Sequence, residues 1–362
     1  MIEDALRKAY KVPDIKYSID QLNNTRPKRD AVIYKMHGDV VQPKYAVLYK
    51  EQYEQYYKTH EPFITALMGD LVSKTFLFIG FSFTDPNLDY VLSRLHTTTK
   101  KDHYCFMRRV VVEKGEDEEL QKYKRRKQEF RVDDLKRYGI QTLLIDEYDE
   151  IPKILQAIQA RFLKRTIFIA GSAENYGDWE RQDALNFVHE LSSSIVQSSL
   201  TVVNGFGWGI GSAVINGALE TIYANPDKFS EEQLIMRPFP QFASKDQKLP
   251  ELWEQYRQRM VSLSGISIFL FGNNVSSSGE LVLANGVERE FEIAVEKGHI
   301  VIPIGATGFV AKKLADLVLG SPEKYYNDMD WIVPLIKELA DESIPHKELV
   351  NKIIKIIQRL EK

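Results

Sequence analysis

The second half of the chain alternates short apolar runs with longer amphipathic stretches. Each run leads into glycine or small polar residues, which predicts buried parallel strands followed by turns. Amphipathic helices are expected between the strands. This alternation predicts a doubly wound α/β domain, whose ligands bind at the carboxyl ends of its strands. The predicted strands are residues 166–170, 200–203, 266–271 and 300–304, and the predicted helices are about 179–197, 212–223 and 287–297.

The first half of the chain shows a similar alternation. Its run at residues 75–79 is wholly apolar and is bounded by Gly80, which predicts a central parallel strand buried on both faces. Together the two halves predict two Rossmann-like parallel-sheet domains, residues 1–164 and 165–362, without a linker rich in proline, glycine or serine. In the first half, strands are predicted at 31–36, 75–79, 103–107 and 141–145, and helices at 50–74 and 150–163.

Composition excludes several classes of protein. The 362 residues carry 48 basic and 51 acidic side chains, and this near-neutral charge argues against a general nucleic-acid binder. The basic run at 122–127 follows acidic residues at 116–119, which predicts a solvated helix face with internal ion pairs. The single cysteine, Cys105, rules out an internal disulfide and favours a reducing compartment. No apolar run reaches the ~18 residues of a membrane span, so a soluble, cytoplasmic protein without a membrane partner is expected.

Glycines recur where two predicted strands of the second domain end. Gly205, Gly207 and Gly209 lie in the loop after one strand, and Gly171 with Ser172 follows another. Such loops let a backbone approach a ligand closely, and the exposed amides at the start of a helix favour an anion. The alternative is that the glycines only form tight turns. Their spacing is neither that of a dinucleotide dehydrogenase nor that of a P-loop nucleotidase.

Further residues of the second domain suit a nucleotide. Arg237, in an extended segment set by two prolines, is a candidate for a phosphate, and Phe239 could stack on a base. Arg257, on a predicted helix, is a candidate for a second phosphate contact. Asn273 follows the end of a predicted strand and joins the candidate ligand contacts. Glu290, near a helix start, could accept ribose hydroxyls or cap the helix.

These segments resemble the SLOG domain, a Rossmann-like nucleotide-sensing fold. The resemblance rests on residues 170–173 (Ala-Gly-Ser-Ala), the glycine loop at 204–212 and the segment 286–291. Related phosphoribohydrolases carry P-G-G-x-G-T-x-x-E where this chain has L-A-N-G-V-E-R-E at 283–290. This departure favours a sensor over an enzyme in the second domain, although hydrolysis of a nucleotide through Glu290 remains an alternative.

Two motifs of the first domain resemble the sirtuin family. Residues 34–39 (Tyr-Lys-Met-His-Gly-Asp) are similar to its histidine motif, and residues 78–87 are similar to a signature of bacterial sirtuin-like defence proteins. The resemblance implies cleavage of the bond between nicotinamide and ribose in NAD+. A neutral histidine could position water or take a proton as an oxocarbenium ion develops, and His37 is the candidate.

The same resemblance implies an NAD+ site at the end of the apolar strand. Gly80 and Ser82 would approach the ribose and phosphates. Asp85 and Asn87 are also assigned to this site, although they would equally suit a helix cap and a turn. The histidines show no spacing typical of metal ligands with carboxylates or with Cys105, so no metal is expected.

A sirtuin-like domain followed by a SLOG domain resembles the effectors of Thoeris anti-phage defence. The resemblance implies an NAD+ hydrolase activated when a cyclic ADP-ribose isomer, made by a TIR-domain cyclase, binds the SLOG domain. Loss of NAD+ would then stop growth of the infected cell. The resemblance also implies a homo-oligomer, a tetramer held by the sirtuin-like domains.

One departure from this family concerns the start of the chain. Residues 1–9 have the pattern of the middle of an amphipathic helix, and the sequence contains no glycine-rich G-A-G-x-S loop for the pyrophosphate of NAD+. We therefore expect a partial sirtuin-like domain, shortened at its N-terminus, and a chain inactive by itself. The alternative function is a non-catalytic regulatory module that binds a cyclic nucleotide.

Overall fold

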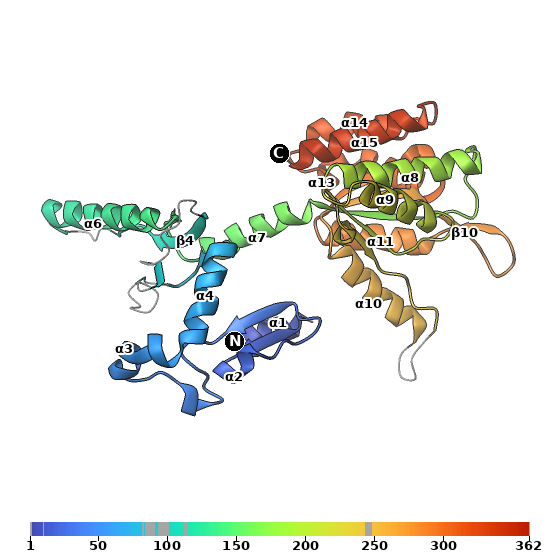
Figure 1. Ribbon diagram of the computed structural model, residues 1–362. Coiled ribbons are helices and arrows are strands. Elements are labelled where there is room, and N and C mark those ends of the chain that lie inside the picture. Colours follow the sequence, from blue (N-terminus) through green and yellow to red (C-terminus); the bar gives the residue numbers. More distant parts are fainter. Residues whose placement is uncertain are drawn as a thin grey trace. The chain divides into compact units, whose positions relative to one another are not determined.

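The computed structural model divides by internal contacts into two units, residues 1–153 and 154–362 (Figure 1). The division falls inside α7 (Glu150–Leu163), upstream of the boundary predicted at 164/165. The structure describes residues 2–9, 11–81, 83, 91–92, 101–111, 115–242 and 248–361.

The second unit is built on a five-stranded sheet with all strands parallel. Its strand order is β12-β9-β6-β7-β8, so the chain starts in the middle, fills one side and then crosses back to fill the other. The carboxyl ends of β6 and β9 therefore form the switch point at which such sheets bind ligands. The strands are β6 (Thr166–Ser172), β7 (Thr201–Asn204), β8 (Leu234–Met236), β9 (Ile266–Phe271) and β12 (Ile300–Pro303).

Helices cover both faces of this sheet. Figure 1 shows α8 and α9 on one side and α10 and α11 on the other. An antiparallel hairpin of β10 (Asn273–Val275) and β11 (Leu281–Leu283) follows β9. The helices are α8 (Arg181–Gln197), α9 (Gly211–Ala224), α10 (Leu249–Val261), α11 (Asn285–Glu296), α12 (Phe309–Gly320), α13 (Pro322–Tyr325), α14 (Val333–Leu339) and α15 (His346–Glu361), with 3-10 turns η2 (Glu231–Gln233), η3 (Gly305–Thr307) and η4 (Asp330–Ile332).

The core of the second unit forms because its elements have the expected apolar patterns. Every residue of β9 is buried, as a central parallel strand requires. Helix α15 buries Leu349, Ile353, Ile356 and Leu360, whose spacing places them on one helical face. That face packs against α8. The sequence-based strands and helices of this unit are thus confirmed, with small shifts at their ends.

The first unit contains two small parallel sheets. Strands β1 (Pro13–Lys16) and β2 (Ala31–Tyr34) form one, and a second has the order β3-β4-β5. The remaining strands are β3 (Leu77–Phe78), β4 (His103–Arg108) and β5 (Ile140–Ile145). The helices are α1 (Ile2–Lys8), α2 (Ile19–Leu22), α3 (Lys50–Thr59), α4 (Glu61–Ser73) and α6 (Glu118–Arg137), with a 3-10 turn η1 (Pro43–Tyr45).

The helix predicted over residues 50–74 is two helices. Helix α3 ends at Thr59, and α4 begins with Glu61 and Pro62. A proline is well accommodated in the first turn of a helix but breaks the hydrogen-bond ladder of a helix interior. The amphipathic pattern continues across this break, so the pattern alone does not reveal it.

The prediction that residues 75–79 form a central strand buried on both faces is wrong. Only Leu77 and Phe78 form a strand, β3, which lies at one edge of the sheet among the described residues. Phe76 and Phe78 pack against the unit's core, whereas Leu77 and Ile79 are 39% and 50% exposed. Successive side chains of a strand face opposite sides, so an apolar run need not be buried on both.

Helix α6 confirms the expected internal pairing of the charged segment. Lys124 pairs with Glu116, and Lys122 pairs with Glu119 at 3.5 Å. Near the end of the helix, Arg137 pairs with Asp134. None of the helices in the described part of the chain has both the length and the apolar composition needed to cross a bilayer.

Close contact between α8 and α9 depends on Gly217. A Cβ at this position would lie 2.1 Å from the carbonyl oxygen of His189 in α8. We expect Gly217→Ala to lower the free energy of unfolding by about 1–3 kcal/mol, because the two helices must separate. Chemical denaturation followed by circular dichroism measures this. The control is Gly320→Ala in α12, where no atom lies within 4 Å of the added carbon, with an expected change below about 0.5 kcal/mol. Equal effects would contradict the packing argument.

Candidate functional site

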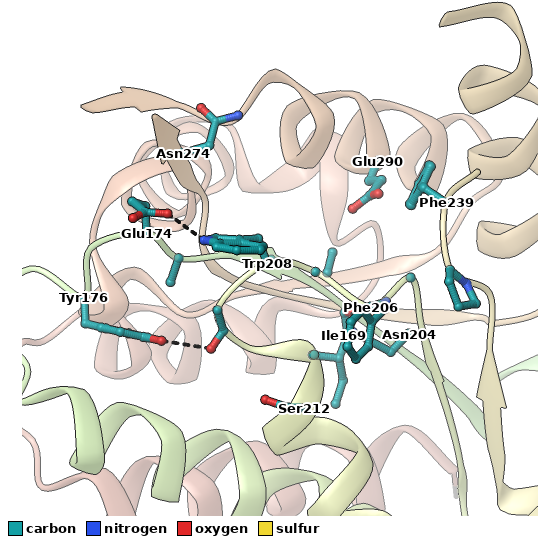
Figure 2. Close-up of a pocket in the computed structure, with 18 of the residues that line it drawn as sticks. Ile169, Glu174, Tyr176, Asn204, Phe206, Trp208, Ser212, Phe239, Asn274 and Glu290 are labelled. Carbon is teal, nitrogen blue, oxygen red and sulfur yellow. Dashed lines mark hydrogen bonds between the residues drawn. The ribbon is translucent and has the colours of Figure 1, made fainter. Parts of the chain in front are cut away.

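A cavity of about 1200 Å³ lies at the carboxyl end of the second unit's sheet. It is lined by the loops after β6, β7 and β8 and by side chains of α10 and α11, as Figure 2 shows for 18 of its residues. This is the position that the strand order assigns to a ligand. The cavity is therefore the candidate functional site of the second unit.

The loops after β6 and β7 fit against each other through glycine. A Cβ at Gly207 would lie 1.9 Å from the carbonyl oxygen of Gly171, and one at Gly209 equally close to that of Ala173. Gly209 also has a φ of +74°, a conformation that favours glycine. In addition, the amide of Ala173 donates to the carbonyl of Trp208 at 2.8 Å. A larger residue at either glycine would separate the two loops.

The start of helix α9 opens on the cavity. Gly211 and Ser212, the first residues of α9, belong to its lining. Asn204, at the end of β7, fixes the preceding loop: its amide donates to the carbonyl of Ile169 at 2.8 Å, and its side-chain oxygen accepts from the amide of Phe206 at 2.7 Å. The amides of Gly211 and Ala213 donate to the carbonyls of Gly207 and Ile210, so this helix start favours an anionic ligand chiefly through its dipole.

A partly buried arginine and a buried carboxylate face each other in the cavity wall. Arg257 Nε lies 3.9 Å from Glu290 Oε1, beyond hydrogen-bond distance, and both side chains are largely removed from solvent. Within the described part of the chain, Arg257 Nε is buried without a hydrogen-bond partner. A buried charged donor of this kind is costly unless another group completes it. Gly286 allows this placement, since its Cβ would lie 3.0 Å from the guanidinium.

The environment of Glu290 keeps its carboxyl partly protonated. Burial raises its pKa to about 7, while the charge of Arg257 acts in the opposite direction. Glu290 lies in the second turn of α11 and lines the cavity, so its side chain faces the ligand space and does not cap the helix. Near neutral pH it can either donate or accept a hydrogen bond.

Phe239 supports Arg257. The guanidinium carbon of Arg257 lies over the Phe239 ring, 5.1 Å from its centre, which is a cation–π geometry. Another contact of this ring is with Gly205, where a Cβ would lie 2.9 Å from a ring carbon. The ring therefore fixes the arginine and the glycine loop at once.

Most of the predicted ligand residues of the second unit line this one cavity. They are Gly171, Gly205, Gly207, Gly209, Phe239, Arg257 and Glu290. Three others do not belong to its lining. Arg237 is exposed, Ser172 donates to the carbonyl of Asn273, and the buried amide of Asn273 fixes the loop at Glu174 and Asn175.

Sequence reasoning missed several lining residues. Trp208 and Tyr176 lie in the loops after β7 and β6, and Trp253 and Arg181 lie on α10 and α8. Glu174, in the loop after β6, accepts a hydrogen bond from Trp208 Nε1 at 2.6 Å. The sequence did offer one signal for Trp208. It is an aromatic residue within a glycine loop, and residues of such a loop are normally exposed to solvent.

In the first unit, His37 lies between a turn and helix α3. Its ring centre is 4.9 Å from that of Tyr53 and 5.4 Å from that of Tyr56, and its carbonyl accepts from the amide of Val47 at 3.0 Å. Tyr56 also stacks on His60, whose pKa is lowered by burial and by the nearby charge of His37. His37 is half-buried, so it retains access to solvent.

Little of the predicted NAD+ strand end is described. Gly80 follows β3 with a φ of +65° and is exposed. Ser82, Asp85 and Asn87 lie outside the described residues. Among the residues that are described, no group of three or more histidine, cysteine or acidic side chains is arranged to hold a metal ion.

Comparison with known proteins identifies both units. Residues 1–143 match the SIR2-like domain, and residues 150–360 match the Sir2- and TIR-associating SLOG family. NAD(+) hydrolase ThsA of Bacillus cereus strain MSX-D12 is 45% identical over 99% of this chain and 75% of its own length. The ThsA of Cytobacillus dafuensis is 41% identical, and that of Acinetobacter baumannii strain 532279 is 38% identical, with coverage of 99% of this chain and 75% and 76% of theirs.

The chain belongs to the ThsA family of NAD(+) hydrolases. The order of the two ThsA domains, SIR2-like and then SLOG, confirms the predicted fold class of two Rossmann-like domains. His37 lies within the SIR2-like match, and the whole cavity lies within the SLOG match. The candidate sites are thus divided between the two ThsA domains.

The raised pKa of Glu290 predicts a pH-dependent stability. Its carboxyl binds protons more tightly in the folded chain (pKa about 7) than at its ordinary value of 4.5, so stability from this group is lost as pH rises from about 5 through 7. We expect a contribution of about 2 kcal/mol between pH 5 and pH 8, which Glu290→Gln removes. Urea unfolding of both proteins across this range measures it. An identical pH dependence in the two would refute the assignment.

Proposed function

We propose that the SLOG unit binds a cyclic ADP-ribose isomer and that this binding activates NAD+ hydrolysis by the sirtuin-like unit. The observation that carries the proposal is Arg257, whose buried Nε has no hydrogen-bond partner among the described residues and stops 3.9 Å short of Glu290. A ligand phosphate between the glycine loop and this guanidinium would supply the acceptor.

The cavity's chemistry supports a nucleotide with a pyrophosphate and riboses. The positive end of the α9 dipole and the guanidinium of Arg257 suit phosphate oxygens, and Glu290 suits a ribose hydroxyl. The volume of about 1200 Å³ exceeds that of most small-molecule pockets, which hold roughly 300–1,000 Å³. The alternative phosphoribohydrolase reaction through Glu290 stays a prediction, tested by release of free base from nucleoside monophosphates.

For the sirtuin-like unit we propose cleavage of NAD+ to nicotinamide and ADP-ribose. The bond between the nicotinamide nitrogen and ribose C1′ breaks, water adds at C1′, and the proton released by water leaves with a base. His37 would orient that water or take its proton. Contacts with Tyr53 and Tyr56 support this role, since they fix the position of the imidazole ring.

We further propose the partners of this activity. The activator would come from a TIR-domain cyclase as a diffusible signal, and the protein would work as a homo-oligomer, expected to be a tetramer. The matching family is described as Sir2- and TIR-associating, which supports a functional link to a TIR domain. No metal and no nucleic acid enter this proposal.

Arg257→Ala tests the activator site. We expect calorimetry with cyclic ADP-ribose isomers to show binding by the wild-type chain and a loss of at least tenfold in affinity in the variant, because a charged contact is worth roughly 1.5–3 kcal/mol. Arg259→Ala, on the same helix α10 but outside the cavity lining, is the matched control and should bind normally. Arg237→Ala should weaken binding less than Arg257→Ala. Absence of binding by the wild-type chain would refute the proposal.

His37→Ala tests the catalytic assignment. The 362 residues hold no G-A-G-x-S loop, so we expect negligible NAD+ turnover by this chain alone. In a form of the protein that carries such a loop, His37→Ala should reduce turnover by at least about 100-fold, as expected for loss of a general base. Nicotinamide release measures both. Undiminished turnover by the variant would exclude His37, and activator binding without turnover in any form would favour the non-catalytic regulatory module.

A further inference from the structure

The cavity contains two aromatic side chains that could receive a nucleobase, and their surroundings differ. Phe239 was the candidate from the sequence. One contact of its ring is with the Arg257 guanidinium, 5.1 Å from the ring centre, and another is with the loop at Gly205. Phe239 is half-buried and one face of its ring carries the guanidinium, so it offers less free surface to a base than an exposed ring does.

Trp208 has an open ring. It is 69% exposed although its loop is packed tightly against the loop after β6. Its indole nitrogen donates to Glu174 at 2.6 Å, and Figure 2 shows the indole directed toward Glu174, with Glu290 and Phe239 on the other side of the drawn cavity. A large aromatic surface is thus held at the cavity by one hydrogen bond at its edge.

The backbone under this indole is fixed. The carbonyl of Trp208 accepts from the amide of Ala173 at 2.8 Å, and the glycines on either side of it contact neighbouring carbonyls. The carbonyl of Gly209 also accepts from the Tyr176 hydroxyl at 2.9 Å. The position of the ring is therefore set by two side-chain torsions and by Glu174.

Phe206, the other exposed aromatic of this loop, is less suited. It is 51% exposed, and one ring carbon would lie 2.9 Å from a Cβ at Gly211, so the ring packs on the start of helix α9. A phenyl ring has no hydrogen-bonding group that could orient it, whereas the indole of Trp208 is oriented by the hydrogen bond from its nitrogen to Glu174.

From these contacts we infer that Trp208 stacks on the base of the bound ligand and that Glu174 holds the indole in the stacking position. This inference rests on the proposed function. It further specifies that the base of the ligand lies at the Trp208 end of the cavity. The ligand class is a phosphate-bearing nucleotide whose charged part meets Arg257 and whose base meets Trp208. Stacking discriminates a nucleotide from a sugar phosphate, because only the base presents a π-face.

Isothermal titration of the 362-residue chain with cyclic ADP-ribose isomers tests the inference, with inorganic pyrophosphate as a probe that has no base. We expect Trp208→Ala to weaken binding of the isomers roughly 10- to 100-fold, the usual loss for a stacked base, and to leave pyrophosphate binding unchanged. Trp208→Phe retains a stacking ring and should restore most of the affinity. Tyr223→Ala is the matched control, because Tyr223 is an exposed aromatic residue on α9 outside the cavity lining.

A second readout keeps the test decisive if Trp208→Ala does not fold. Three of the four tryptophans, Trp179, Trp208 and Trp253, line the cavity, so ligand-induced quenching in the wild type should be reduced, though not abolished, in Trp208→Phe while binding persists. Glu174→Ala should reduce affinity more than Glu174→Gln, which keeps an acceptor for the indole. Unchanged affinity in Trp208→Ala, or undiminished quenching in Trp208→Phe, would overturn the inference and leave the proposed function standing. If the wild-type chain binds no isomer, the proposed function fails first.

Discussion

The close approach of two strand-end loops determines the site of the second unit. Where β6 and β7 end, Gly207 and Gly209 meet the carbonyls of Gly171 and Ala173 at distances that exclude any side chain. This contact brings the start of α9 to the switch point of the sheet and turns the side chain of Trp208 outward. The cavity, the helix start in its wall and its exposed indole therefore all depend on the same backbone contact.

Much of this fold could be predicted from sequence because local pattern and tertiary role agree in the second unit. Strands such as β9 are apolar and fully buried, and each is followed by small residues at the ligand edge. In the first unit the agreement is weaker. The run around Leu77 is as apolar as β9, yet its strand lies at a sheet edge among the described residues, and composition carries no information on strand order. The break at Pro62 was missed because amphipathicity continues through it.

The site could be predicted in part, for a related reason. Glycine loops, Arg257 and Glu290 have residue types that are informative in any context, whereas the role of Phe239 depends on what packs against its ring. Only the structure shows the Arg257 guanidinium over that ring and the Glu174 carboxylate at the edge of Trp208. Contacts between residues that are distant in sequence cannot be seen in the local sequence pattern. The different roles of Phe239 and Trp208 depend on such contacts and therefore could not be predicted.

The charge of the cavity explains how a nearly neutral protein can select a phosphate ligand. The charged residues of its lining are Glu174, Arg181, Arg257 and Glu290, two of each sign. Burial raises the pKa of Glu290 to about 7, so below that pH the carboxyl is mostly protonated and the lining has a net positive charge although the formal count is zero. A phosphate bound as proposed would disfavour the carboxylate further. Under the proposed function, Glu290 would accommodate an anionic ligand by holding its proton, and one buried group would favour a phosphate without a basic surface.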